Sequence, residues 1–150
     1  MAEPEEMELE KVHDTLGKAV QLQAESVLTM TLLAGTIRGL GGAGIKQDIR
    51  QFVQAELEDT YKLIEKLSAL GGTPILLTPA IQVQSDTAKA LNDLLEHERK
   101  AVAALHGVIP HSGQEPRSEA LEHLLEHVIM RKQQQIDYLW HAAEHEDPLD

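Results

Sequence analysis

The sequence predicts an all-α protein, an antiparallel four-helix bundle formed as a single domain by residues 1–150. Apolar residues recur at helical spacing in four long segments, and Gly/Pro-rich links separate these segments. Only 3% of the residues are aromatic, so the core must consist mainly of Leu, Ile, Val and Ala, a composition that we read as helical rather than sheet-forming. A chain of 150 residues can bury such a core.

The first two helices are expected at residues 8–38 and 45–70. The first ends at the link "GLGGAG". The second ends at "GGTP", where Gly71 or Gly72 supplies the C-cap and Pro74 prevents continuation. Because "GLGGAG" is short, the two helices should be antiparallel neighbours.

The third and fourth helices follow the same logic. The third should start near Ser85 and Asp86 and end at "GVIP". The fourth should begin after Pro116, with Ser118 as its N-cap, and run to about His145. The link "GVIPHSGQEPR" still allows an antiparallel pair.

The link between the second and third helices is much longer than the others. The stretch "GGTPILLTPAIQVQS" can extend to about 50 Å, whereas a helix of ~26 residues is about 39 Å long. This link can therefore cross the full length of the bundle, which predicts the ferritin-like arrangement with one long crossover.

Charge and composition exclude several classes of function. The formal net charge is −12, from 25 acidic and 13 basic residues, so the surface should repel nucleic acid and anionic lipid. The chain has no Cys and therefore no disulfide or thiolate metal site. The start "MAEPEEMELE" lacks an apolar signal region, and no apolar run spans a bilayer. We expect a cytoplasmic protein without nucleic-acid or membrane partners.

Polar side chains interrupt the apolar stripes of the last three helices. In the second helix, Glu56 and Asp59 stand in the middle of the stripe, and in the third Glu98 is central. In the fourth, Lys132 and Gln135 take such positions. Burying an unpaired charge costs several kcal/mol (roughly), so we expect these groups to meet at one internal polar site rather than to be separate snorkelling side chains.

The first helix has two apolar stripes. One surrounds Glu25 and consists of Leu22, Leu28, Leu32 and Thr36. The other lies on the opposite side and consists of Leu9, Leu16, Val20 and Val27. Two stripes imply two burial partners, so we expect Glu25 in the internal site and the second stripe in a subunit interface of at least a homodimer. Alternatively, the second stripe is the core face and Glu25 lies outside.

Several stretches resemble motifs of ferritin-like proteins, and of bacterioferritins in particular. "ELEDTYKLIEKLSALGG" looks like the helix-two stretch with a ligand Glu and, three residues on, a ligand His. "LLEHERKAVAAL" is similar to the helix-three stretch with a bridging Glu, and "QQIDYL" resembles the helix-four stretch that starts at a ligand His. "QAESVL" matches the helix-one ligand Glu by position. The resemblance covers nearly the whole chain and implies ferritin-type iron handling.

By position, the resemblance implies that three iron-binding glutamates are retained, namely Glu25, Glu56 and Glu98. Asp59 stands where the family has its first ligand His, Lys132 at the fourth Glu and Gln135 at the second His. The di-iron pattern needs two Glu-x-x-His pairs, and neither is complete at the matched positions. Leu57 replaces the haem-ligating Met, so no haem is expected. The chain stops at "HEDPLD" without the family's fifth helix, which makes a 24-subunit cage doubtful.

The charges at these positions predict what the site can bind. Four carboxylates against the Lys132 ammonium leave three negative charges, which call for one divalent cation and a proton, or for extensive protonation. Oxygen ligands without His favour iron, Mn, Mg or Ca over Zn or Cu. The predicted function is metal or iron binding, by one ion or none, at Glu25, Glu56, Asp59 and Glu98, with weak or absent ferroxidase activity.

Two other interpretations stay open. A non-enzymatic structural or interaction bundle would use Lys132 and the carboxylates as a metal-free ion-pair core. A different metal centre would use the His pairs spaced four residues apart on the fourth helix, His123 with His127 and His141 with His145.

Overall fold

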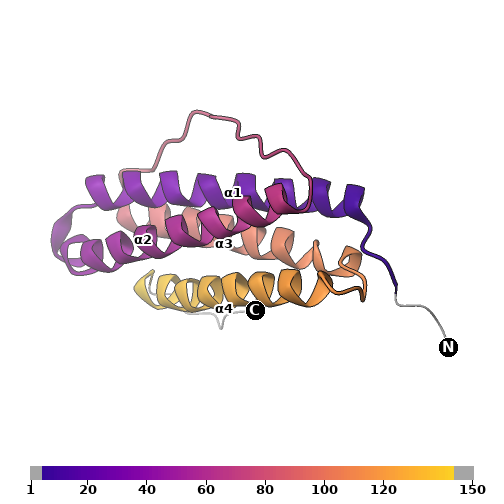
Figure 1. Ribbon diagram of the computed structural model, residues 1–150. Coiled ribbons are helices and arrows are strands. Elements are labelled where there is room, and N and C mark those ends of the chain that lie inside the picture. Colours follow the sequence, from indigo (N-terminus) through magenta and orange to yellow (C-terminus); the bar gives the residue numbers. More distant parts are fainter. Residues whose placement is uncertain (1–4, 144–150) are drawn as a thin grey trace.

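The computed structural model describes residues 5–143. Over this range the chain forms α1 (Leu9–Thr36), α2 (Gly39–Ala69), α3 (Thr87–His106), the short 3-10 helix η1 (Ile109–His111) and α4 (Ser118–Ala142), with no strand. The predicted all-α four-helix bundle is confirmed. In Figure 1 the helices lie side by side, and the link between α2 and α3 arches over α1 along the bundle. Among the described residues, no helix is long and apolar enough to cross a membrane.

The Gly-rich segment after α1 is helical, which the sequence analysis did not predict. Only Ile37 and Arg38 separate the helices, and "GLGGAG" forms the first turns of α2. Gly39 takes a positive φ of 84°, a conformation that glycine adopts without a steric penalty and that reverses the chain here. Gly42 lies so close to Ile37 that a Cβ would come within 3.0 Å of its side chain. A side chain at position 42 would therefore displace the side chain of Ile37.

The end of α2 agrees with the prediction. Gly71 has a positive φ of 87°, its N–H donates to Ser68 O, and the Gly72 N–H donates to Leu67 O. These two bonds form a Schellman motif. Farther along the crossover, the side-chain amide of Gln21 bonds both backbone groups of Leu77, at 2.9 and 3.1 Å, which attaches the crossover to α1.

The start of α3 agrees with its predicted cap residue, whereas α4 starts one residue earlier than predicted. Asp86 accepts a hydrogen bond from the Lys89 N–H at 2.9 Å and caps α3. Ser118, the predicted N-cap of α4, is instead its first helical residue. Its buried hydroxyl donates to Ser112 O and accepts from the Glu115 N–H, so it stabilises the preceding turn. The predicted end near His145 falls outside the described residues, and α4 ends at Ala142.

The core face of α1 is the stripe that was expected to form a subunit interface. Leu16 is 0% and Val20 1% exposed within the single chain, so the predicted interface through Leu9, Leu16, Val20 and Val27 is wrong. By contrast, Leu28 and Leu32 of the other stripe are exposed. Because α1 carries apolar residues on both sides, its periodicity alone did not distinguish the inner from the outer face.

Candidate functional site

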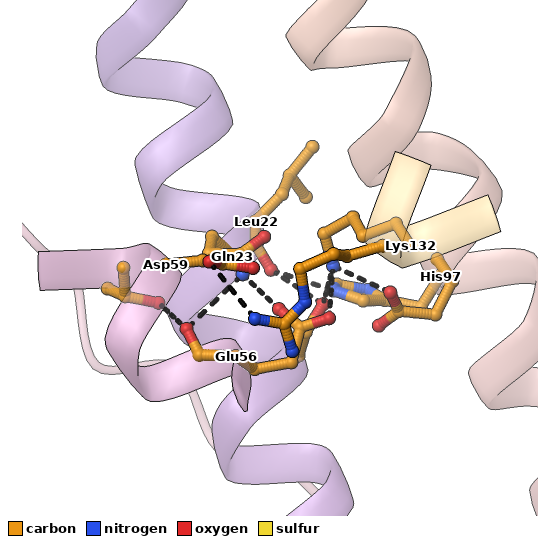
Figure 2. Close-up of polar contacts among 10 residues, drawn as sticks. Leu22, Gln23, Glu56, Asp59, His97 and Lys132 are labelled. Carbon is orange, nitrogen blue, oxygen red and sulfur yellow. Dashed lines mark hydrogen bonds and ion pairs between the residues drawn. The ribbon is translucent and has the colours of Figure 1, made fainter. Parts of the chain in front are cut away.

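The ammonium of Lys132 lies inside the bundle, between carboxylates from two other helices (Figure 2). The side chain is 1% exposed. Its Nζ donates to Glu98 Oε2 of α3 at 2.6 Å and to Glu56 Oε1 of α2 at 3.0 Å, and it lies 3.5 Å from Ser26 Oγ of α1. The prediction that Lys132 reaches at least two of the candidate carboxylates is confirmed. We call Lys132, Glu56 and Glu98 the lysine centre.

Burial and charge set the protonation of the lysine centre. Burial raises the pKa of Glu56 from 4.5 to about 7, although the Lys132 ammonium lowers it, and the Glu98 carboxylate raises it further. Burial alone lowers the pKa of Lys132, but its contacts with Glu98 and Glu56 outweigh this, so the pKa stays above 10.5. Lys132 is therefore charged at neutral pH, while Glu56 takes up a proton more readily than an ordinary glutamate.

The side chain that α1 contributes to Glu56 is Gln23, which the sequence analysis missed. Gln23 is 0% exposed, and its amide donates to the Glu56 carboxylate (Figure 2). Gln23 lies three residues after Val20 and seven after Leu16, so it interrupts the stripe that is the core face. Had that stripe been assigned to the core, Gln23 would have been the expected polar residue.

Glu25 lies outside the lysine centre, contrary to the prediction. It is partly exposed and accepts a hydrogen bond from Gln21, one turn earlier in α1, at 3.4 Å. Glu25 is two positions after Gln23, and each residue advances by roughly 100° around the helix. The two side chains therefore point in directions about 160° apart. Of the four candidate carboxylates, three are therefore internal.

Asp59 lies at the edge of the site and has cationic partners of its own. Its side chain is 2% exposed, with Arg131 Nη1 at 3.4 Å and His127 Nε2 at 3.9 Å from Oδ1. Burial raises the pKa of Asp59, although Arg131 and His127 lower it. The sequence analysis missed Arg131, whose long side chain reaches back from α4. We call Asp59, Arg131 and His127 the arginine edge.

Gln135 is buried, as its place on the apolar stripe predicted, at 4% exposure. Its Oε1 has no hydrogen-bond partner within the described residues, and the same holds there for Gln23 Oε1 and Glu98 Oε1. Buried acceptors normally have a partner. Three oxygens in this part of the bundle could therefore accept from water or coordinate a cation.

The charges and donors of the site do not fit a di-iron centre. In the lysine centre, two carboxylates against one ammonium leave one negative charge, and Asp59 is offset by Arg131. Within residues 5–143, no hydrogen bond or ion pair joins a His to Glu56 or Glu98, and Lys132 contacts both carboxylates directly. Among residues 5–143, no group of three or more His, Asp or Glu could hold a metal ion. The described residues of this site thus differ from the four glutamates and two histidines of a di-iron centre in both donor set and charge.

The His pairs of α4 do not form a second centre in the described chain. His127 turns to Asp59, whereas His123 lies on the surface 3.9 Å from Glu119. His141 is exposed, and His145 lies outside the described residues. His123 and His127 therefore have different partners and do not meet at one site.

Architecture and site together define the class. A four-helix bundle with one long crossover and carboxylates projecting inward from facing helices is the arrangement of ferritin-like proteins. The family described as "Ferritin-like domain" matches residues 13–146, and the chain belongs to this family. No curated protein matches the sequence.

Solved structures show the same fold at low sequence identity. A ferritin-like, diiron-carboxylate protein from Bacillus anthracis str. Ames is 16% identical with a TM-score of 0.79, covering 91% of this chain and 97% of its own. A dodecameric thioferritin, the bacterioferritin-related protein from Bacteroides fragilis, is 14% identical with a TM-score of 0.80, covering 91% and 86%. The predicted ferritin-like fold is confirmed.

Proposed function

We propose that this protein is a ferritin-like bundle in which a lysine ammonium takes the place of the metal, so that it serves as a structural or assembly protein with weak or absent ferroxidase activity. One observation carries the proposal: Lys132 Nζ bonds Glu56 and Glu98 at once, with all three side chains at most 1% exposed. A fixed cation at this point satisfies the carboxylates that would otherwise bind iron.

Charge compensation supports a core that needs no metal. The one negative charge left in the lysine centre matches a single proton, and the raised pKa of Glu56, about 7 because of its burial, supports this carboxyl as the group that takes it up. Asp59 needs no metal because Arg131 and His127 surround it. Buried charges are tolerated when they are paired and hydrogen-bonded, and both conditions are met here.

A second candidate is one oxygen-ligated divalent cation bound beside Lys132. It is favoured by three of the four buried oxygens that lack partners among the described residues, those on Gln23, Glu98 and Gln135. Iron, Mn, Mg or Ca would suit such donors, since these ions accept carboxylate and carbonyl oxygen. Ordered water would satisfy the same oxygens and is the alternative under the first proposal.

Metal analysis of protein purified without an affinity tag tests the first proposal against the second. We expect far less than one equivalent of any transition metal or of Mg and Ca, and ferrous oxidation no faster than in buffer. About one equivalent of tightly held metal would support the second candidate. Two equivalents of iron with rapid oxidation would contradict both.

A rebuilt site provides the positive control. Lys132→Glu with Gln135→His restores the family's residues on α4, and Asp59→His adds the first ligand His of α2. We expect the triple variant to bind iron and to oxidise ferrous ions faster than the parent. If it binds none even when Gln23→Glu supplies the α1 carboxylate, the assignment of the lysine centre to the family's metal position is wrong.

We also propose that the chain assembles as a homo-oligomer through the outer faces of α1 and α2. Leu28 and Leu32 of α1, and Leu57 and Tyr61 of α2, are large apolar side chains exposed at 39–55%. Such surfaces mark interaction sites when they are contiguous. Changing Leu28 and Leu57 to Lys should lower the mass measured by light scattering while the helical circular dichroism stays unchanged. An unchanged mass would contradict this interface.

A further inference from the structure

A small hollow opens at the end of the bundle where α1 turns into α2. Its volume is about 150 Å³, and its apolar lining comes from Leu33 and Ile37 at the end of α1, Val83 in the crossover and Ala90 in α3. These residues meet because the α1–α2 turn, the end of the crossover and the start of α3 lie at the same end of the bundle (Figure 1). We call this feature the end hollow.

The end hollow is not on the outer faces of α1 and α2 through which assembly is proposed above. Leu33 comes five positions after Leu28, and each residue advances by roughly 100° around a helix, so the two side chains point about 140° apart. On its other side the hollow is bordered by the crossover and α3. The end hollow is therefore a separate surface, and it shares no residue with the lysine centre.

Leu40 is an apolar side chain without cover in the single chain. At 97% it has the largest exposed fraction of the large apolar side chains in the described part of the protein. It stands two residues after Arg38, which lines the end hollow. The glycines beside Leu40 border open space, because a Cβ added at Gly41 or Gly44 would meet nothing within 4 Å. One end of the bundle thus presents both an apolar hollow and an apolar side chain that does not fill it.

The end hollow suits a leucine side chain in size and in polarity. A cavity of about this volume with an apolar lining takes up benzene, and the four carbons of a leucine side chain need no more room. Burying them is favourable because apolar surface leaves water. Since Leu40 points into solvent in its own chain, the Leu40 that fills the hollow has to come from a second copy.

The charges at this end also favour a second copy as the partner. The chain has a net charge of −12, so two copies repel each other over most of their surface. Residues 37–46 contain Arg38 and Lys46 but no acidic residue, and neither cation has an ion-pair partner within residues 5–143. Asp86 stands in the segment that borders the end hollow. In an end-to-end contact, the cationic turn of one copy therefore faces a carboxylate of the other.

We propose that two copies of the chain associate end to end, each inserting its Leu40 into the end hollow of the other. The contact is reciprocal because the leucine and the hollow lie on the same end, as a two-fold interface requires. It goes beyond the proposed function, since it is a second contact surface. Together with the outer faces of α1 and α2, it joins pairs of chains into a larger assembly.

Light scattering of the full chain and of a Leu40→Ala variant tests the proposal. A two-fold contact loses two buried leucines, and each contributes roughly a factor of ten. We therefore expect the end-to-end association to weaken at least about a hundredfold and the measured mass to fall. The helical circular dichroism should not change because Leu40 is exposed. Met130→Ala, at another exposed apolar position (57%) on α4, is the control and should keep the mass of the wild type. An unchanged mass in Leu40→Ala would overturn the proposal.

The background of Leu28→Lys with Leu57→Lys separates the two contact surfaces. In this background we expect a dimer held through the end hollow, and a monomer once Leu40→Ala is added. If the background variant keeps the wild-type mass, the outer-face interface is contradicted, and the loss of mass on adding Leu40→Ala still supports the end-to-end contact. A background variant that is already a monomer would overturn the end-to-end contact.

Cross-linking locates the contact, because the chain has no Cys and each introduced thiol is unique. Gly41→Cys places a thiol beside Leu40 in open space, and Ser85→Cys places one at the rim of the end hollow. When the two variants are mixed and treated with a short bis-maleimide, we expect a product that links residues 41 and 85 of two chains. Gly41→Cys mixed with Met130→Cys is the control. Absence of the 41–85 product, or an equal yield in the control, would overturn the proposal.

Discussion

Two carboxylates one turn apart in α2 are paired with cations in different ways. Glu56 and its partner Lys132 are both 1% exposed. Asp59 is 2% exposed, but its partner Arg131 is 25% and His127 47% exposed. The lysine centre is therefore enclosed on both sides of the ion pair, whereas the cations of the arginine edge keep contact with solvent.

The difference shows that the solvent exposure of the cation decides how much an internal ion pair contributes to stability. An ammonium shielded from bulk solvent depends on its carboxylates, because losing one partner leaves an uncompensated buried charge. A guanidinium at the surface retains water as an alternative partner. Mutations in the two regions should therefore have unequal effects, although both remove one cation from α4.

The largest effect is expected for Lys132→Met. It leaves Glu56 and Glu98 buried without their cation and should lower the free energy of unfolding by about 3–5 kcal/mol, as for other broken buried pairs. Urea denaturation at pH 7 measures this value. The triple variant Lys132→Met, Glu56→Gln and Glu98→Gln should recover part of the loss, because no charge is then left unpaired. A loss below about 1 kcal/mol in the single variant would mean that water solvates the two carboxylates and that they do not depend on Lys132.

The pH dependence of stability should be dominated by Glu56. Its pKa rises from 4.5 to about 7 on folding, so the folded state holds the proton more tightly. The stabilisation from that proton is complete below pH 4.5 and is lost as the pH rises through 7, a change of about 3 kcal/mol. Asp59, whose pKa is also raised, acts in the same direction.

Glu56→Gln checks this dependence. The difference in unfolding free energy between wild type and the variant should change by about 3 kcal/mol from pH 4.5 to pH 8. Glu58→Gln, at an exposed position of the same helix, should leave the profile of the wild type unchanged. Parallel profiles for wild type and Glu56→Gln would show that Glu56 does not carry the proton.

A smaller effect is expected at the arginine edge. Arg131→Gln removes the closest cation from Asp59 but leaves His127 and access to water, so we expect a loss of about 1–2 kcal/mol. The loss should shrink at low pH, where Asp59 takes up a proton. A loss as large as that of Lys132→Met would mean that the two regions form one coupled network, which the double variant would reveal as non-additivity.

The smallest effect is expected for a pair that is exposed on both sides. Lys18 lies 3.3 Å from Asp14 on α1, at 71% and 66% exposure. Lys18→Met should change the unfolding free energy by less than about 0.5 kcal/mol. It also serves as the control for Lys132→Met, because it makes the same lysine-to-methionine change at a solvent-exposed position.

The pattern of apolar residues by itself determined most of the fold. The four helices, the long crossover and the Gly71 cap follow from periodicity and link length, which are local properties of the chain. The same reasoning predicted that Lys132, Glu56 and Glu98 share one interior, because each interrupts a single unambiguous stripe and a buried charge needs a partner. The structure brings these three side chains into contact.

Only the tertiary structure decided which face of α1 turns inward and which partners the edge residues find. Two apolar stripes made both orientations of α1 compatible with its sequence, and packing selected the one with Gln23 inside and Glu25 outside. The pairing of Arg131 with Asp59 depends on the separation of α2 and α4 and on the reach of a long side chain. Neither quantity is contained in the spacing along one helix. The exclusion of Glu25 and the pairing of Asp59 with Arg131 together lower the internal negative charge from three to one.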